Sequence, residues 1–209
     1  MSIAEVSLIA PEPRALPTDD QSLARLARAG DSAAMEALIR RWQVPLVRFL
    51  QRRVGNHSDA EDLFQDTFVR VCQNLQQYDD RRSFKTWLFT IAWRLAANHL
   101  RDRRQSSDDQ ALEAVHDPRI RPAESAQARD DHENLWAIAR RELSPDHVQM
   151  LWLCYVEGFS PREIASVMDK SWIAVKTALH RARRALTPHL GTFGPVSTGT
   201  PTQSKDGTP

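Results

Sequence analysis

Apolar residues recur along most of this chain at intervals of three and four positions, the spacing of a helix that buries one face. The pattern runs from about Ser22 to Leu100 and resumes from Leu135 to Leu190. No segment alternates apolar and polar residues with the period of two that a half-buried strand requires. The sequence therefore predicts an all-α protein without a sheet.

Caps and breakers divide the first block of this pattern into several helices. Pro45 is expected to begin a new helical turn, because proline lacks the amide hydrogen that a helix interior uses. The pair Gly55-Asn56 is expected to end that segment. We expect Ser58 or Asp59 to open the next helix.

The stretch 158–184 carries the most specific local pattern. Ser160 is expected to cap a short helix, and Glu163 completes an S-x-x-E capping box. Asp169-Lys170 then breaks the pattern, and Ser171 is expected to cap a second helix. That helix has one apolar stripe, made of Val175, Leu179, Ala182 and Leu186. Its other side carries Ile173, Ala174, Thr177, His180, Arg181 and Arg184. One packed side and one basic side are what a helix-turn-helix needs to enter a DNA major groove about 12 Å wide.

The charge of the chain is distributed unevenly. The 209 residues include 41% hydrophobic and 26% charged residues, as in an ordinary globular protein, and the net charge is only +1. Residues 81–104 nevertheless contain seven Lys or Arg against one acid, and residues 168–190 contain five against one. Residues 105–134 contain three basic residues against eight acids. Because a local field decides polyanion binding, the two basic blocks favour a nucleic-acid partner.

Several other functions find little support in the sequence. Cys72 and Cys154 are far apart without a C-x-x-C spacing, so we expect both to pack in the core and no metal or cofactor to be bound. No apolar run approaches the roughly 18 residues of a membrane span, and the N-terminus does not read as a secretion signal. A cytoplasmic protein is therefore expected. Nucleophile–base groupings and phosphate loops are also missing, which argues against an enzyme.

Acidic and amide residues line one side of the helix expected from Asp59. They are Asp62, Gln65, Asp66 and Val69, at i, i+3, i+4 and i+7. Such a row has two interpretations: a solvated face whose acids favour the helix N-terminus, or a docking face for a basic partner helix. The pattern alone favours the first.

A second segment, expected to form a helix from Ser83, combines aromatic and basic residues. Phe84, Trp87 and Phe89 lie near its start, and the arginines Arg101, Arg103 and Arg104 lie at its end. Cations and stacking rings together are typical of single-stranded DNA binding. Alternatively, the rings belong to the core and the arginines complement the helix dipole.

Three stretches, taken in order, resemble an extracytoplasmic-function sigma factor of the sigma-70 family. The stretch from Asp59 to Val71, DAEDLFQDTFVRV, is similar to the family's polymerase-binding helix. The stretch from Arg81 to Arg104, RRSFKTWLFTIAWRLAANHLRDRR, is similar to the part that melts the minus-ten element. GFSPREIASVMDKSWIAVKTALHRARRAL, from Gly158, is similar to the reader of the minus-thirty-five element. The resemblance covers about two thirds of the chain. It implies a promoter-specificity subunit of bacterial RNA polymerase that assists promoter opening.

The resemblance also implies roles for individual residues. Core polymerase, through its clamp helices and flap, would be the protein partner, contacted by Asp62, Gln65, Asp66 and Val69. Single-stranded minus-ten DNA would be contacted by Tyr78, Arg81, Arg82, Ser83, Lys85 and Arg101. Duplex minus-thirty-five DNA would be contacted by Ser171, Ile173, Ala174, Lys176, Thr177, His180, Arg181 and Arg184. An anti-sigma factor is a further partner that the resemblance implies. The family commonly has Gly-Thr where Ile173-Ala174 stand, so we expect more phosphate and shape readout here.

These observations divide the chain into two small helical domains on a tether. A flexible arm (residues 1–20) precedes a region-2-like domain (21–104), and a flexible acidic linker (105–131) leads to a helix-turn-helix domain (132–190). Residues 191–209, rich in Gly, Thr, Ser and Pro, are expected to be a disordered tail. Two alternatives remain open: a sigma mimic that sequesters an anti-sigma factor, and a stand-alone helix-turn-helix repressor.

Overall fold

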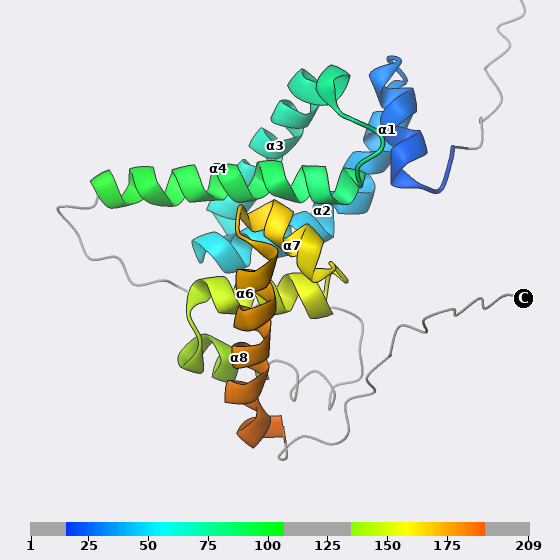
Figure 1. Cartoon of the computed structure of the whole chain (residues 1–209). Coiled ribbons are helices and arrows are strands. Elements are labelled where there is room, and N and C mark those ends of the chain that lie inside the picture. Colours follow the sequence, from blue (N-terminus) through cyan, green and yellow to red (C-terminus); the bar gives the residue numbers. More distant parts are fainter. Residues whose placement is uncertain (1–15, 107–134, 191–209) are drawn as a thin grey trace, which may run out of the picture.

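The computed structural model describes residues 16–106 and 135–190, and this part of the chain is helical without a strand (Figure 1). The all-α prediction is thus confirmed. The elements are α1 (Asp20–Arg28), α2 (Ser32–Val54), α3 (His57–Asn74), the 3-10 turn η1 (Leu75–Gln77), α4 (Phe84–Ser106), α6 (Pro145–Tyr155), α7 (Pro161–Met168) and α8 (Trp172–Leu190). Residues 135–142 are also helical. The expected N-terminal arm up to residue 15, most of the acidic linker and the C-terminal tail lie outside the described residues.

Helix α2 is longer than its sequence predicts. Asp31 caps it by accepting a hydrogen bond of 3.0 Å from the amide of Ala34, and Gly55 ends it with a φ of +88°. The expected new start at Pro45 is wrong, because the helix continues through that residue. Proline removes one helical hydrogen bond at a cost of about 3 kcal/mol. Burial of the apolar face on both sides of Pro45, including Trp42 before it and Leu46 after it, offsets that cost.

The cap of helix α3 (His57–Asn74) lies two or three residues earlier than expected. Asn56 is its cap and accepts a hydrogen bond of 2.7 Å from the amide of Asp59, so Ser58 and Asp59 already belong to the first turn. Cys72 is exposed, which corrects the expectation of core packing, and Cys154 is only half-buried. Cys72 lies three positions after the exposed Val69 and therefore shares its side of the helix.

The two helical parts lie against each other. Helices α6 and α7 pack on α2 and α4, and Figure 1 shows the long α4 crossing above α6 and α7. The apolar core is continuous between the parts: the rings of Phe89 on α4 and Phe159, just before α7, are 5.1 Å apart at their centroids. Each part also has its own core, with Phe49, Leu50 and Phe84 buried in the first part.

Candidate nucleic-acid interface

The turn between α7 and α8 is built as the sequence predicts. Ser160 and Glu163 form both halves of the capping box, with hydrogen bonds of 3.3 Å from the Glu163 amide to Ser160 Oγ and 2.8 Å from the Ser160 amide to Glu163 Oε2. Asp169 closes α7 in the left-handed region, with φ of 52° and ψ of 50°. Ser171 Oγ accepts a hydrogen bond of 3.2 Å from the amide of Ala174 and so caps α8. These caps fix where α8 begins.

Helix α8 presents its predicted outer face to solvent. Its apolar stripe is buried, as expected for Val175, Leu179, Ala182 and Leu186. All eight predicted duplex-contact residues are exposed: Ser171, Ile173, Ala174, Lys176, Thr177, His180, Arg181 and Arg184. Ile173 is 69% exposed, which makes it an apolar tip near the start of the helix. An exposed helix face that carries Lys176, Arg181 and Arg184 together with an apolar tip can enter a major groove.

Trp172 extends this surface, although the sequence pattern did not assign it a role. Its side chain is 43% exposed, and the cations of Arg162 and Lys176 lie 5.7 Å and 5.4 Å from its ring. Both distances are within the range of a cation–π contact. The available sequence signal was a tryptophan directly after the expected Ser171 cap and outside the apolar stripe of the helix.

The loop that follows η1 is anchored by Tyr78. The side chain is buried, its ring centroid lies 4.9 Å from that of Trp87, and its hydroxyl donates a hydrogen bond of 2.6 Å to the carbonyl oxygen of Arg82. Burial, with Asp80 and other acids nearby, raises the pKa of Tyr78 to about 12. Arg28 of α1 donates a hydrogen bond of 3.0 Å to the carbonyl oxygen of Tyr78. Tyr78 therefore shapes the loop from inside.

The other predicted minus-ten residues are spread along this loop and α4. Arg81 and Arg82 are exposed on the loop, and Ser83 Oγ accepts a hydrogen bond of 3.3 Å from the amide of Thr86 at the start of α4. Arg101 is exposed near the other end of the same helix. Lys85 differs from them, because it is half-buried against the helix-turn-helix part. Burial lowers the pKa of Lys85, and the nearby carboxylates of Glu157 and Glu163 oppose that effect.

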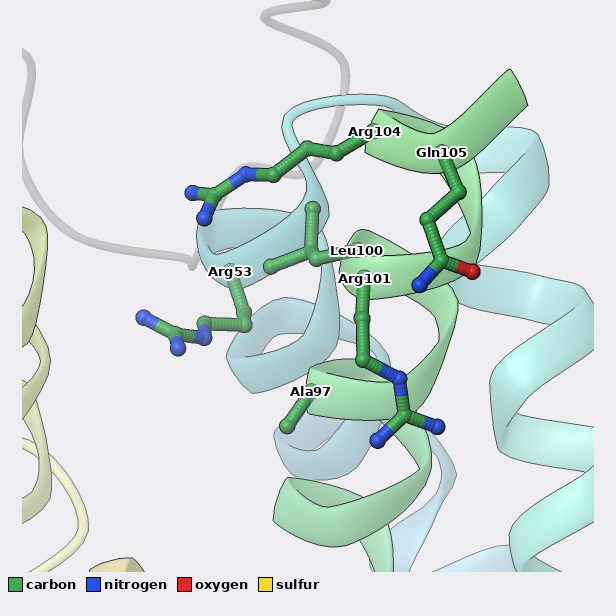
Figure 2. Close-up of a pocket in the computed structure, with 6 residues that line it drawn as sticks. All are labelled: Arg53, Ala97, Leu100, Arg101, Arg104 and Gln105. Atoms are coloured by element: carbon green, nitrogen blue, oxygen red, sulfur yellow. The ribbon is translucent and has the colours of Figure 1, made fainter. Parts of the chain in front are cut away.

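A basic groove lies at the C-terminal end of α4. It has a volume of about 420 Å³ and is lined by Arg53, Ala97, Leu100, Arg101, Arg104 and Gln105. Figure 2 shows Arg53 of α2 and Arg104 of α4 extending to the same side, with Leu100 between them and Arg101 turned the other way. Guanidinium groups attract phosphate, and those of Arg53 and Arg104 share one side of this groove, where Arg53 also donates a hydrogen bond of 2.8 Å to Asp146. Arg53 was missed at the sequence level, because no local pattern brings it next to Arg104.

The acidic row on α3 is open to solvent. Asp62, Gln65 and Asp66 are exposed, and Val69 is 53% exposed. The opposite side of α3 packs into the core through Leu63, Phe68 and Val71. Asp59 is separate from the row: it accepts a hydrogen bond from His99 of α4 at 3.0 Å and thereby joins the two helices. The row is therefore a free surface of one helix, as either interpretation of the sequence requires.

The described residues contain neither a candidate metal site nor a candidate membrane-spanning helix. Within 16–106 and 135–190, no group of three or more His, Cys, Asp or Glu side chains could hold a metal ion. None of the helices in this part of the chain is both long and apolar enough to cross a bilayer.

The described fold carries two distinct exposed surfaces, the outer face of α8 with its basic residues and the acidic row on α3. Residues 38–106 match the family Sigma-70 region 2, and residues 141–186 match Sigma-70, region 4. The chain belongs to the sigma-70 family and to its extracytoplasmic-function group, as its resemblance implied.

Individual relatives agree with this assignment. The chain is 30% identical to the RNA polymerase sigma-H factor of Pseudomonas aeruginosa over 182 residues, which is 82% of this chain and 93% of the relative. It is 31% identical to the ECF RNA polymerase sigma factor SigL of Mycobacterium tuberculosis over 175 residues, which is 80% of this chain and 95% of the relative. The solved structure of CnrH in complex with the cytosolic domain of CnrY matches with a TM-score of 0.59 at 26% identity, covering 83% of this chain and 98% of CnrH.

Proposed function

We propose that this chain is the initiation subunit that directs bacterial core RNA polymerase to specific promoters and assists their opening, without catalytic activity of its own. The observation that carries the proposal is the pairing of two surfaces on one sigma-70 fold. An exposed acidic row lies on α3, and an exposed helix-turn-helix face with several basic residues lies on α8. Because RNA polymerase works in the cytoplasm of bacteria, the protein would act there.

The row of Asp62, Gln65, Asp66 and Val69 would dock on the clamp helices of core polymerase. Carboxylates on an exposed helix face attract basic residues and orient the approach of a partner, and the exposed Val69 adds apolar contact at the end of the row. The opposite, buried side of α3 keeps this face rigid. The helix-turn-helix part would dock separately, on the flap.

The Tyr78 loop and α4 would hold the melted minus-ten strand. Arg81, Arg82 and Arg101 are exposed cations for the DNA backbone, and the hydrogen bonds made by Tyr78 and Ser83 keep the loop in one shape. Arg53 and Arg104 in the basic groove are further backbone contacts in this proposal, since their guanidinium groups lie on the same side of the groove.

The outer face of α8 would read the minus-thirty-five duplex. Ile173, Ala174, Thr177 and Arg181 would face base edges, with Lys176, His180 and Arg184 nearer phosphates. The acidic linker would cross the polymerase where RNA leaves, its negative charge imitating RNA. CnrH is bound to another protein, CnrY, and we propose that this chain likewise has an inhibitory protein partner, an anti-sigma factor.

Runoff transcription tests the proposal. Core polymerase with this chain is expected to initiate at discrete sites on fragments of its own genome, and core polymerase alone is not. Mapping the start sites then gives the promoter elements. A chain that binds core enzyme yet never initiates would point to the alternative, a sigma mimic that sequesters an anti-sigma factor. A mimic has no need of exposed cations at Arg101 or Arg181, which favours the first function.

A further inference from the structure

Two capped helix starts bring Arg162 and Trp172 to the same corner of the helix-turn-helix. Arg162 lies inside the capping box of α7, whose hydrogen bonds fix the backbone on either side of it. Trp172 is the first residue of α8 and directly follows the Ser171 cap. The central guanidinium carbon of Arg162 lies 5.7 Å from the ring centroid of Trp172. The start of α7 therefore meets the start of α8 through these two side chains.

Lys176 joins this contact from α8. It lies four positions after Trp172, hence on the same side of the helix, and its ammonium nitrogen is 5.4 Å from the ring centroid. Both cations are exposed, and Trp172 is itself 43% exposed. We call Arg162, Trp172 and Lys176 the Trp172 cluster. Its ring contacts two cations and is still open to solvent.

The two cations of the Trp172 cluster lack a carboxylate partner. Among residues 16–106 and 135–190, no acid forms an ion pair with Arg162 or Lys176. Lys170, in the turn between the two helices, behaves differently, because it lies 3.1 Å from the carboxylate of Asp146. Glu163, next to Arg162 in sequence, is engaged in the capping box. Two like charges at one ring repel each other, so the cluster favours an anion as its ligand.

The position of the Trp172 cluster indicates which anion this is. In a helix-turn-helix the N-terminal residues of the second helix meet base edges, and the first helix crosses the DNA backbone. Trp172 lies at that N-terminus and Arg162 lies on the first helix, so the cluster falls where the phosphates of one strand border the groove. Guanidinium and ammonium groups both bind phosphate. A ring that holds them before binding reduces the entropy lost when two long side chains become ordered.

We propose that the Trp172 cluster binds backbone phosphates at the edge of the minus-thirty-five element. Arg162 and Lys176 contact the phosphates, and Trp172 is a positioning residue that holds both cations in place. The inference rests on the proposed binding of α8 to minus-thirty-five duplex and adds a contact from α7 to the same DNA. Because phosphates are the same at every base pair, this contact contributes affinity without sequence preference.

Substitutions at Trp172 test its positioning role. Trp172→Leu removes the ring and keeps an apolar residue at an exposed site, so the fold should survive. The variant holoenzyme is expected to bind promoter fragments, mapped by runoff transcription, about two- to fivefold more weakly than the wild type. The loss should be the same when bases of the minus-thirty-five element are changed. Trp172→Phe keeps an aromatic face and is expected to recover part of the affinity.

A mutant cycle separates positioning from direct contact. Arg162→Ala is expected to weaken promoter binding and to lower the slope of the logarithm of the binding constant against that of salt concentration by about 1. In a chain with both Arg162→Ala and Lys176→Ala, Trp172→Leu should cause no further loss. Arg141→Ala is the matched control, because it removes an exposed arginine outside α7 and α8 and should leave the slope unchanged.

Neutral phosphates in the DNA give a test that does not depend on how a variant folds. Each phosphate around the minus-thirty-five element is replaced in turn by an uncharged methylphosphonate. The wild-type holoenzyme is expected to lose affinity at one or two adjacent positions, by about as much as Arg162→Ala loses on unmodified DNA. At those positions the Arg162→Ala, Lys176→Ala variant should lose nothing further.

Each result decides between this inference and the proposed function. Equal sensitivity of the wild type and the double variant to every methylphosphonate would overturn the Trp172 cluster as a phosphate site. A loss in Trp172→Leu that follows base identity would overturn it in favour of a base contact, and unchanged DNA binding with weaker core binding in favour of a protein contact. In all three cases the proposed function stands if the wild-type holoenzyme initiates on the same fragment. If the wild type does not initiate there, both proposals fail.

Discussion

The hydroxyl of Tyr78 donates a hydrogen bond of 2.6 Å to the carbonyl oxygen of Arg82, four residues further along the chain. The bond crosses the loop that is proposed to hold the melted minus-ten strand. It fixes the backbone beside Arg82, whose side chain is exposed. The buried ring of Tyr78 thus shapes the loop from inside.

Tyr78→Phe is expected to lower the free energy of unfolding by about 0.5–1.5 kcal/mol, because it removes this hydrogen bond and keeps the ring. Urea denaturation followed by circular dichroism measures the change. Promoter opening by the variant holoenzyme should fall as well, since the loop loses a fixed shape. Unchanged opening at unchanged stability would show that the loop is held by other contacts.

Charge reversal on α3 should remove core binding. Asp62→Lys with Asp66→Lys turns the acidic row basic, and both side chains are exposed, so the fold should survive. A pull-down with core polymerase is expected to retain the wild type and lose the variant. Glu36→Lys with Glu142→Lys, at two exposed acids away from α3, is the control with the same change in net charge. Equal retention of the wild type and the double variant would remove α3 from the polymerase interface.

Much of the fold could be predicted from local pattern. The Ser160–Glu163 box, the Asp169 turn and the buried stripe of α8 depend on residues close in sequence, and each is found as predicted. The expected helix start at Pro45 was wrong, because burial of apolar residues on both sides of Pro45 outweighs the cost of proline inside a helix. The local sequence pattern alone does not show which of these two free energies is larger.

The site was predicted less completely than the fold. Residues along one helix face, such as Asp62 and Asp66, follow from helical spacing. Contacts between distant segments do not: Gln149 and Phe49 are 100 positions apart, and Arg53 meets Arg104 only across the basic groove. The packing that covers Lys85 belongs to this second kind.

Arg181 and Arg184 should differ in what they contribute to duplex binding. Arg181→Ala is expected to cost about 1–3 kcal/mol and to relax the preference at one base pair, because an arginine facing base edges reads sequence. Arg184→Ala should weaken binding to all DNA sequences alike. It should also lower the slope of the logarithm of the binding constant against the logarithm of salt concentration by about 1, as for a phosphate contact. Holoenzyme binding to promoter fragments at several salt concentrations separates the two. Identical profiles for both variants would contradict the assignment.

Ile173 should read a thymine methyl group. An apolar side chain that is 69% exposed at the start of α8 lies where a recognition helix first meets bases, and thymine presents its methyl group in the major groove. Ile173→Ala is expected to weaken promoter binding by about 1 kcal/mol. Deoxyuridine in place of the contacted thymidine should cause a similar loss in the wild type and little further loss in the variant. Val156→Ala, at an exposed apolar residue outside α8, is the control. If the losses caused by Ile173→Ala and by deoxyuridine simply add at every thymidine, Ile173 contacts none of these methyl groups.

The capping box should make stability depend on pH through Glu163. Burial opposes ionisation of this carboxyl, but hydrogen bonds from the side chain and backbone of Ser160 outweigh it and hold the pKa of Glu163 below its usual 4.5. The folded chain therefore binds fewer protons than the unfolded chain in this range, so the contribution is complete above pH 4.5 and is lost as pH falls through the lower, folded value. Glu163→Gln keeps an acceptor for Ser160 but cannot titrate. Urea denaturation at a series of pH values is expected to show the wild type more stable by about 0.5–1 kcal/mol at neutral pH, with the difference shrinking in acid. A difference that stays constant across this range would mean that the carboxylate charge contributes nothing to the cap.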